Sequence, residues 1–126
     1  MSNAIVQYVL LRSDLIKELG WSIGALVAQA CHASTAVMYL HREDEYTAQY
    51  LSDLDNMHKV VLEVPNEASL RKLADKLKEN SIDHKLWIEQ PENIATCLAM
   101  KPYPKEQVKK YVGKFKLYNK TLSNTA

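Results

Sequence analysis

The sequence predicts an α/β protein: a three-layer sandwich in which a four-stranded mixed sheet has helices on both faces. Stretches rich in β-branched and aromatic residues alternate with stretches whose apolar residues recur at helical spacing, in the order β-α-α-β-α-β-β-α. The early crossovers are long enough to join parallel strands with right-handed connections. The last two strands are separated by only a short loop, which indicates an antiparallel pair.

The first half of the chain predicts one strand followed by helices. Residues 4–12, AIVQYVLLR, are typical of a central strand that is buried on both faces. Residues 13–20 form a polar connection with helical propensity. Residues 22–42 predict the longest helix, with Ser22 as its N-cap. A second helix is expected over residues 44–57, acidic outside and with these side chains turned inward: Tyr46, Tyr50, Leu51 and Leu54.

The second half predicts the rest of the sheet and two more helices. Strands are expected over residues 59–64, 84–90 and 94–100. An amphipathic helix is expected over residues 67–80, and Pro104 suits the first turn of a helix that runs to about residue 113. Residues 116–126 end in small polar side chains and are expected to fray.

The long helix has two distinct sides when its residues are placed at 100° intervals. One side is expected to face the core and consists of Ile23, Leu26, Val27, Ala30, Ala33, Ser34 and Val37. A stripe of small residues with one amide and one imidazole is expected to point away from the core: Ala25, Gln29, His32 and Ala36. Small neighbours would let another surface approach Gln29 and His32.

Composition points to one globular domain over residues 1–126, with 47% hydrophobic and 25% charged residues. The net charge of +1 names no partner, but residues 101–126 hold seven lysines against Glu106 alone. Such a basic segment suits phosphates, and a plain solvated face is an equally open interpretation. Two widely spaced cysteines favour a reducing compartment, and with no visible secretory signal the default location is cytoplasmic. No membrane association is expected, because no apolar run looks long enough to span a bilayer.

Two groups of residues could carry chemistry. His32 can act as an acid or base near neutral pH, with the Gln29 amide one turn away, although a histidine on a helix is more often structural or merely exposed. The loop from Glu89 to Asn93, with Thr96 beyond it, suits a binding loop or a simple polar hairpin. No metal site is expected, because HExxH and CxxC spacings are lacking, and no nucleotide-binding or serine-hydrolase signature occurs.

The segment GALVAQACHA at residues 24–33 resembles the type 2 peptidyl-tRNA hydrolase family, in which a glycine-lysine pair precedes small residues, a glutamine and a histidine-alanine pair. The matching positions are Gly24, Ala28, Gln29, His32 and Ala33. The resemblance extends over nearly the whole chain. Two longer motifs, ALVAQACHA at 25–33 and LWxEQPENIATC at 86–97, are similar to the peptidyl-tRNA hydrolase domain-containing subgroup.

This resemblance implies a carboxylic ester hydrolase that cleaves the bond between a peptide, or an N-blocked amino acid, and the 3′ end of tRNA. It implies a role in translation, tRNA as partner and no cofactor, and it allows a homodimer. The catalytic residues expected are His32, Gln29, Glu89 and Gln90. Substrate contacts are expected from Ser22, Gly24, Glu92, Asn93, Thr96, Lys105 and Lys109.

Two positions depart from the family pattern. The family's lysine after the motif glycine is Ala25 here, and its aspartate aligns with Gln90, which cannot act as a base. Glu89 or Glu92 is the candidate replacement carboxylate, and the candidate cations are Lys17 and Lys85. The alternative hypothesis is therefore a weakened or inactive family member that binds tRNA or a protein partner.

Overall fold

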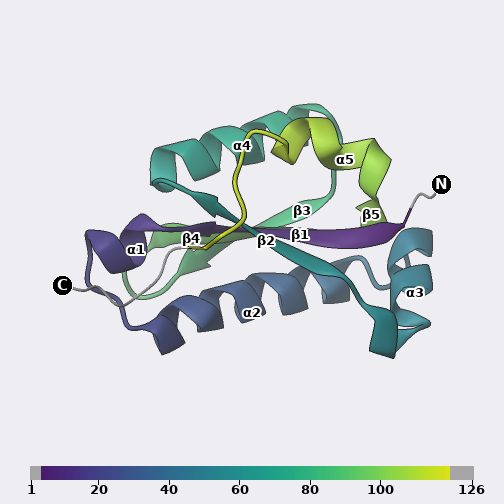
Figure 1. Ribbon diagram of the computed structural model, residues 1–126, viewed down its shortest axis with the longest axis horizontal. Helices are drawn as coiled ribbons and strands as arrows, with labels where there is room; N and C mark the ends of the chain where they lie inside the picture. Colours follow the sequence, from purple (N-terminus) through teal and green to yellow (C-terminus); the bar gives the residue numbers. More distant parts are fainter. Residues whose placement is uncertain (1–3, 120–126) are drawn as a thin grey trace.

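The computed structural model describes residues 4–119 and contains a sheet between two helical layers (Figure 1). Helix α2 (Ile23–Leu40) covers one face, whereas α4 (Glu67–Glu79) and α5 (Lys105–Val112) cover the other. The short helices α1 (Asp14–Lys17) and α3 (Glu45–Leu51) lie at opposite ends of the sheet. The predicted three-layer α/β arrangement is confirmed.

The strand order is β2-β1-β4-β3. Strand β1 (Ile5–Arg12) is parallel to β2 (Lys59–Val64), and β4 (Ile94–Met100) is antiparallel both to β1 and to β3 (His84–Glu89). The predicted antiparallel pair at the end of the sheet is therefore confirmed. A two-residue strand that the sequence did not reveal, β5 (Tyr103–Pro104), pairs with the start of β1.

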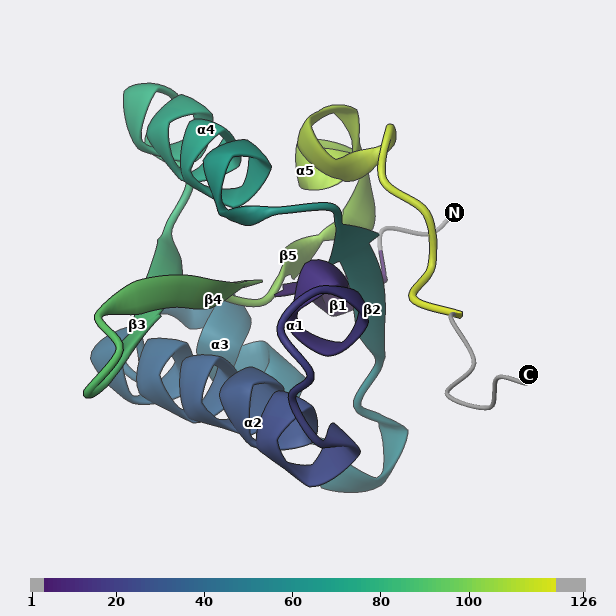
Figure 2. The ribbon, with the colours of Figure 1, turned by 90° about the vertical axis from the view of Figure 1, so that its left-hand side faces the viewer.

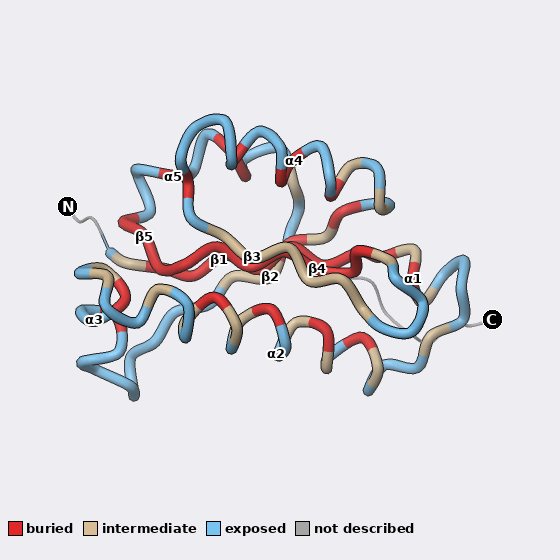
Figure 3. Tube along the Cα trace, turned by 180° about the vertical axis from the view of Figure 1, so that it is seen from behind, coloured by how far each residue is buried: buried red, intermediate tan, exposed pale blue. Residues whose placement is uncertain are grey.

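Strand β1 is central and buried from Val6 onward, which is what its β-branched and aliphatic composition predicted. Its side chains divide between two hydrophobic clusters. Tyr8 and Leu10 contribute to the cluster under α4 and α5, and Val9 and Leu11 contribute to the one under α2. Buried backbone accordingly runs through the middle of the molecule (Figure 3).

The expectation of one helix over residues 44–57 is wrong beyond Leu51. Helix α3 ends there, and a separate 3-10 turn, η1, spans Leu54–Asn56. The Ser52 hydroxyl donates a hydrogen bond of 2.7 Å to the carbonyl oxygen of Gln49, a local bond that competes with helix continuation. Tyr50 is buried as expected, but Leu51 and Leu54 are exposed.

The expected fraying over residues 116–126 is wrong for the first part of this segment. The backbone N–H of Glu63 donates to the carbonyl of Lys116, and that of Tyr118 donates to Val61, each at 2.9 Å. Leu62 and Leu117 form an antiparallel bridge. The segment therefore continues the sheet beyond β2, and residues 120–126 lie outside the described part of the chain.

Helix α2 also corrects the expectation that no apolar run is long enough for a membrane span. Its 18 residues have a mean hydropathy of 1.3, which is long and apolar enough by length and composition alone. In this structure the helix lies along the sheet, and Leu26, Ala33 and Val37 belong to the hydrophobic cluster there.

A charged network fixes the end of the sheet that carries the candidate site. Arg12, only 5% exposed, donates from Nε and Nη2 to the two carboxylate oxygens of Asp14 at 2.9 and 2.8 Å. Its Nη1 donates to the carbonyl oxygen of Ala95 at 2.8 Å, and the N–H of Ala95 donates to Glu67 Oε2 at 3.0 Å. Both polar groups of Ala95 are therefore held by charged side chains, which makes these hydrogen bonds stronger than neutral ones.

We predict that Glu67→Gln destabilises the protein in a pH-dependent manner. The N–H of Ala95 and the Arg71 side chain hold the pKa of Glu67 below its ordinary value. A lowered folded-state pKa means that the ionised carboxylate stabilises the fold above about pH 4.5, and that this contribution is lost as the pH falls through the lowered value. We expect urea unfolding at pH 7 to show a loss of about 1 kcal/mol, which shrinks toward pH 3.

The matched control is Glu79→Gln, an exposed carboxylate at the other end of α4, which should change stability little at either pH. A deficit in the Glu67 variant that stays constant between pH 7 and pH 3 would contradict the electrostatic explanation.

Candidate active site

Strand β4 carries one extra residue where it passes α2. Trp87 pairs with Cys97 and Ile88 pairs with Ala95, so Thr96 has no partner residue on β3 and forms a β-bulge. Thr96 Oγ1 donates a hydrogen bond of 2.7 Å to Gln29 Oε1 on α2. Both side chains are buried, and the bond therefore links the middle of α2 to the bulge.

The expectation that the Gln29 stripe points away from the core is wrong for Gln29. The buried side of α2 consists of Leu26, Gln29, Ala33 and Val37, while Ile23 and Val27 are 56% and 51% exposed. The helix is rotated so that Gln29 meets Thr96. Its small neighbours Ala25 and Ala36 are half-buried.

His32 is exposed one turn beyond Gln29, and its ring stacks on Trp87 of β3. The ring centroids are 4.8 Å apart and the planes are inclined by 22°. Trp87 Nε1 donates a hydrogen bond of 2.8 Å to Glu89 Oε1. Alternation along the strand places Lys85 on the same face of β3 as Trp87 and Glu89. One surface therefore holds an imidazole, an indole, a carboxylate and an ammonium group.

The loop after β3 is a compact turn. The backbone N–H of Asn93 donates to the carbonyl of Glu89 at 2.7 Å, and the side-chain amide of Gln90 lies 3.5 Å from that of Asn93. Asn93 has a φ of 59°, a left-handed conformation that asparagine tolerates better than most residues, and the peptide bond between Gln90 and Pro91 is cis. Glu92 is exposed on this turn, which leads directly into β4 and the bulge.

The remaining candidates lie apart from His32. Ser22 caps α2 as predicted, by accepting a hydrogen bond of 3.1 Å from the N–H of Ala25. Gly24 lies in the first helical turn, with open space where a Cβ would stand. Lys105 and Lys109 belong to α5, on the opposite face of the sheet, so they do not join this site (Figure 1).

Comparison with known proteins places this arrangement in a family. Residues 5–118 match the family model described as "Peptidyl-tRNA hydrolase PTH2". The chain belongs to this family. It is 56% identical over 117 residues to the human protein named "Putative peptidyl-tRNA hydrolase PTRHD1", covering 92% of this chain and 84% of that protein.

A second relative belongs with these comparisons, and a solved structure shares the fold. The chain is 30% identical over 116 residues to the "Peptidyl-tRNA hydrolase" of Methanothermobacter thermautotrophicus, covering 88% of this chain and 97% of that protein. The solved structure of an Agrobacterium tumefaciens protein of unknown function superposes with a TM-score of 0.61, covering 94% of this chain and 100% of that one. At 17% identity the latter shows a shared fold only.

Trp87 is a residue of this candidate site that the motifs did not identify as functional. Alternation along β3 places it on one face with Glu89, but its stacking on His32 depends on how α2 crosses the strand. The neighbouring Cys97 is fully buried, which raises the pKa of its thiol and leaves it unreactive. Within residues 4–119, no group of three histidine, cysteine or carboxylate side chains could hold a metal ion.

We predict that Thr96→Val and Gln29→Leu are energetically coupled. Either change leaves a buried polar group without its partner, which costs about 1 to 3 kcal/mol. The double variant removes both polar groups, so it should lose less than the sum of the two single variants by about 1 kcal/mol. Urea unfolding of the four proteins measures this coupling. The control is Thr35→Val, at an exposed position on the same helix, which should change the free energy of unfolding by less than about 0.5 kcal/mol. If the losses of the two single variants simply added up in the double variant, the proposed coupling between Gln29 and Thr96 would be contradicted.

Proposed function

We propose that the protein hydrolyses the ester that joins a peptide, or an N-blocked amino acid, to the 3′ end of tRNA. The observation that carries the proposal is an exposed histidine, His32, held against Trp87 and next to the buried Gln29–Thr96 pair in a PTH2 chain. Ester hydrolysis needs an activated water and stabilisation of developing charge, and this surface offers groups for both.

In this proposal His32 is the general base. Its imidazole accepts a proton from water as the water oxygen attacks the ester carbonyl carbon. The tetrahedral intermediate then collapses, and the 3′ oxygen of the tRNA leaves with the proton that the imidazolium returns. The products are a peptide acid and a tRNA with a free 3′ hydroxyl, and one water molecule is consumed for each ester cleaved.

Trp87 and Glu89 are proposed to stabilise the positive charge that the imidazole gains as water attacks. An indole face at 4.8 Å attracts a cation through its ring quadrupole. The carboxylate of Glu89, which is bonded to the edge of the same indole, adds a negative charge on this surface. Gln29 and Thr96 act as positioning residues, because they fix the helix that carries His32 against β4.

The replaced family positions limit the expected rate. Ala25 and Gln90 supply no charge, so Lys85 and Glu89 are the groups proposed to act in their place. Loss of one well-placed charge from an electrostatic site costs about 100-fold to 1000-fold in rate. With tRNA as substrate we expect a cytoplasmic location, and a homodimer stays a prediction.

Ala25 and Gln90 favour a second function, a tRNA- or protein-binding module without turnover. Such a module would bind tRNA in a salt-sensitive manner and release nothing from a blocked aminoacyl-tRNA. The two functions therefore differ in one product, free tRNA.

We predict that His32→Ala lowers the turnover number for an N-blocked aminoacyl-tRNA by at least about 100-fold, because the general base is removed. Release of deacylated tRNA measures the effect. The matched control is His58→Ala, an exposed histidine between α3 and β2, which should retain activity. Equal activity of the His32 variant and the wild-type protein would overturn the assignment.

We predict that Glu89 is the functional carboxylate of the two glutamates near the hairpin. Glu89→Gln should lower the turnover number about tenfold, because the imidazolium loses a compensating charge. Glu92→Gln, on the exposed turn, should change it less than about twofold. A larger effect at Glu92 would identify that residue as the replacement for the family aspartate.

A further inference from the structure

A groove between α4 and the chain that follows α5 lies on the opposite face of the sheet from His32. Figure 2 shows the two helices together above the sheet, with α2 below it. The groove has a volume of about 510 Å³, and its buried floor includes Leu73 and Tyr111. Lys72 and Lys76, one turn apart on α4, share its rim with Lys114. We call this cavity the basic groove.

The three lysines of the basic groove have no carboxylate partner in the described part of the chain. All three are exposed, and none makes an ion pair with a carboxylate anywhere in residues 4–119. Their neighbour Arg71, by contrast, is paired with Glu67 at 2.9 Å. Three like charges around one cavity raise its electrostatic potential and favour a bound anion.

Charge is distributed unequally between the two helical layers. The 18 residues of α2 include no lysine, arginine, aspartate or glutamate. The opposite layer and the segment after it carry more cations than carboxylates. The cations are Arg71 and the lysines Lys72, Lys76, Lys78, Lys105, Lys109, Lys110, Lys114 and Lys116, and the carboxylates of α4 and α5 are Glu67, Asp75, Glu79 and Glu106. A polyanion is therefore attracted to the α4–α5 layer rather than to the layer that carries His32.

We propose that the basic groove binds the phosphodiester backbone of the tRNA body, separately from the hydrolytic site. This inference rests on the proposed function for the identity of the RNA. Lysine side chains neutralise phosphates, and the half-buried ring of Phe115 at the groove offers an apolar surface to a ribose or base.

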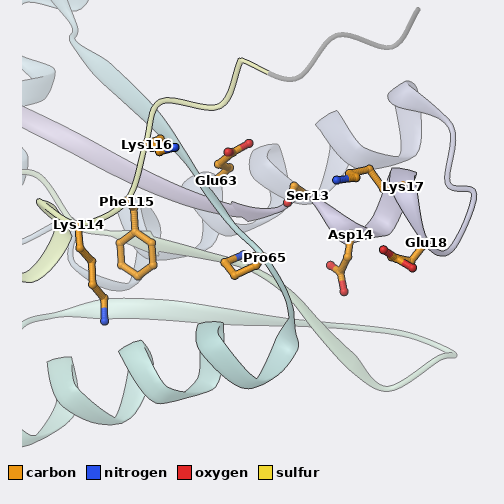
Figure 4. Close-up of a pocket in the computed structure, with 9 residues that line it drawn as sticks. All are labelled: Ser13, Asp14, Lys17, Glu18, Glu63, Pro65, Lys114, Phe115 and Lys116. Carbon is orange, nitrogen blue, oxygen red and sulfur yellow. The ribbon is translucent and has the colours of Figure 1, made fainter. Parts of the chain in front are cut away.

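A second cavity connects the basic groove to the end of the molecule where α2 begins. It has a volume of about 420 Å³ and shares Pro65, Lys114 and Phe115 with the groove (Figure 4). Lys17 lies at its far side with Glu18, and Glu63 also lines it. This cavity therefore carries mixed charge, and the uncompensated positive charge is concentrated in the basic groove.

The test compares two double variants with the same change in net charge. Lys72→Gln/Lys76→Gln removes charge from the groove, and Lys78→Gln/Arg42→Gln removes it from exposed positions outside the groove. The probe is deacylated tRNA, so binding is measured without hydrolysis. We expect the groove variant to bind tRNA at least about tenfold more weakly. We also expect the salt dependence of its binding to weaken: the magnitude of the slope of log K against log salt should decrease by about 1.5, because about two phosphate contacts are lost. The control lowers the general positive charge of the layer through Lys78 but removes no lysine of the groove, so its binding should weaken by at most about threefold.

Activity provides a second readout. With an N-blocked aminoacyl-tRNA the groove variant should show a raised KM and an unchanged kcat, while a blocked aminoacyl ester of the terminal trinucleotide should be cleaved as by the wild-type protein. Unchanged tRNA binding, or an equal loss in both double variants, overturns the proposal. Groove-specific loss of binding by a protein without turnover supports the groove and refutes the hydrolase function.

Discussion

The buried guanidinium of Arg12 is the constraint on which the site end of the molecule depends. A charge at the end of a central strand is costly unless it is paired and fully hydrogen-bonded. Asp14 and the carbonyl of Ala95 satisfy it directly, and Glu67 lies 3.8 Å away. These partners come from the first turns of α1 and α4 and from β4, so one side chain aligns four elements. Thr96, the next residue along β4, forms the bulge that bonds to Gln29 of α2.

Much of the fold follows from local patterns in the sequence. The strand and helix order, the antiparallel final pair and the Ser22 cap depend on periodicity and capping, which act within a few residues. The orientation of α2 does not. Gln29 is buried because its partner is Thr96, 67 positions away in the chain, and a helical wheel that ranks residues by hydrophobicity assigns a glutamine to the outside. The stacking of Trp87 on His32 likewise depends on how two elements cross.

The site residues divide in the same way. The motifs identified His32, Gln29 and Thr96. The structure pairs Gln29 with Thr96 at the bulge and places His32 one turn further along α2, against Trp87. The basic C-terminal quarter predicted contacts from lysines such as Lys105 and Lys109 to tRNA phosphates. The fold instead places α5 on the far face, where Lys109 pairs with Glu106. The charge of a segment indicates whether its partner is an anion or a cation, whereas only the fold shows on which face of the molecule that partner can bind.

The short pairing of residues 116–118 with β2 has a consequence for solubility. Strand β2 is the outermost of its side in the order β2-β1-β4-β3, and an uncovered outer strand presents free N–H and C=O groups that can template another chain. The bonds from Glu63 and Tyr118 occupy part of that row. At the other margin, β3 carries Lys85, a residue type that discourages strand addition. Intermolecular β-pairing is therefore disfavoured at both edges of the sheet, at β2 by the backbone bonds of residues 116–118 and at β3 by the charge of Lys85.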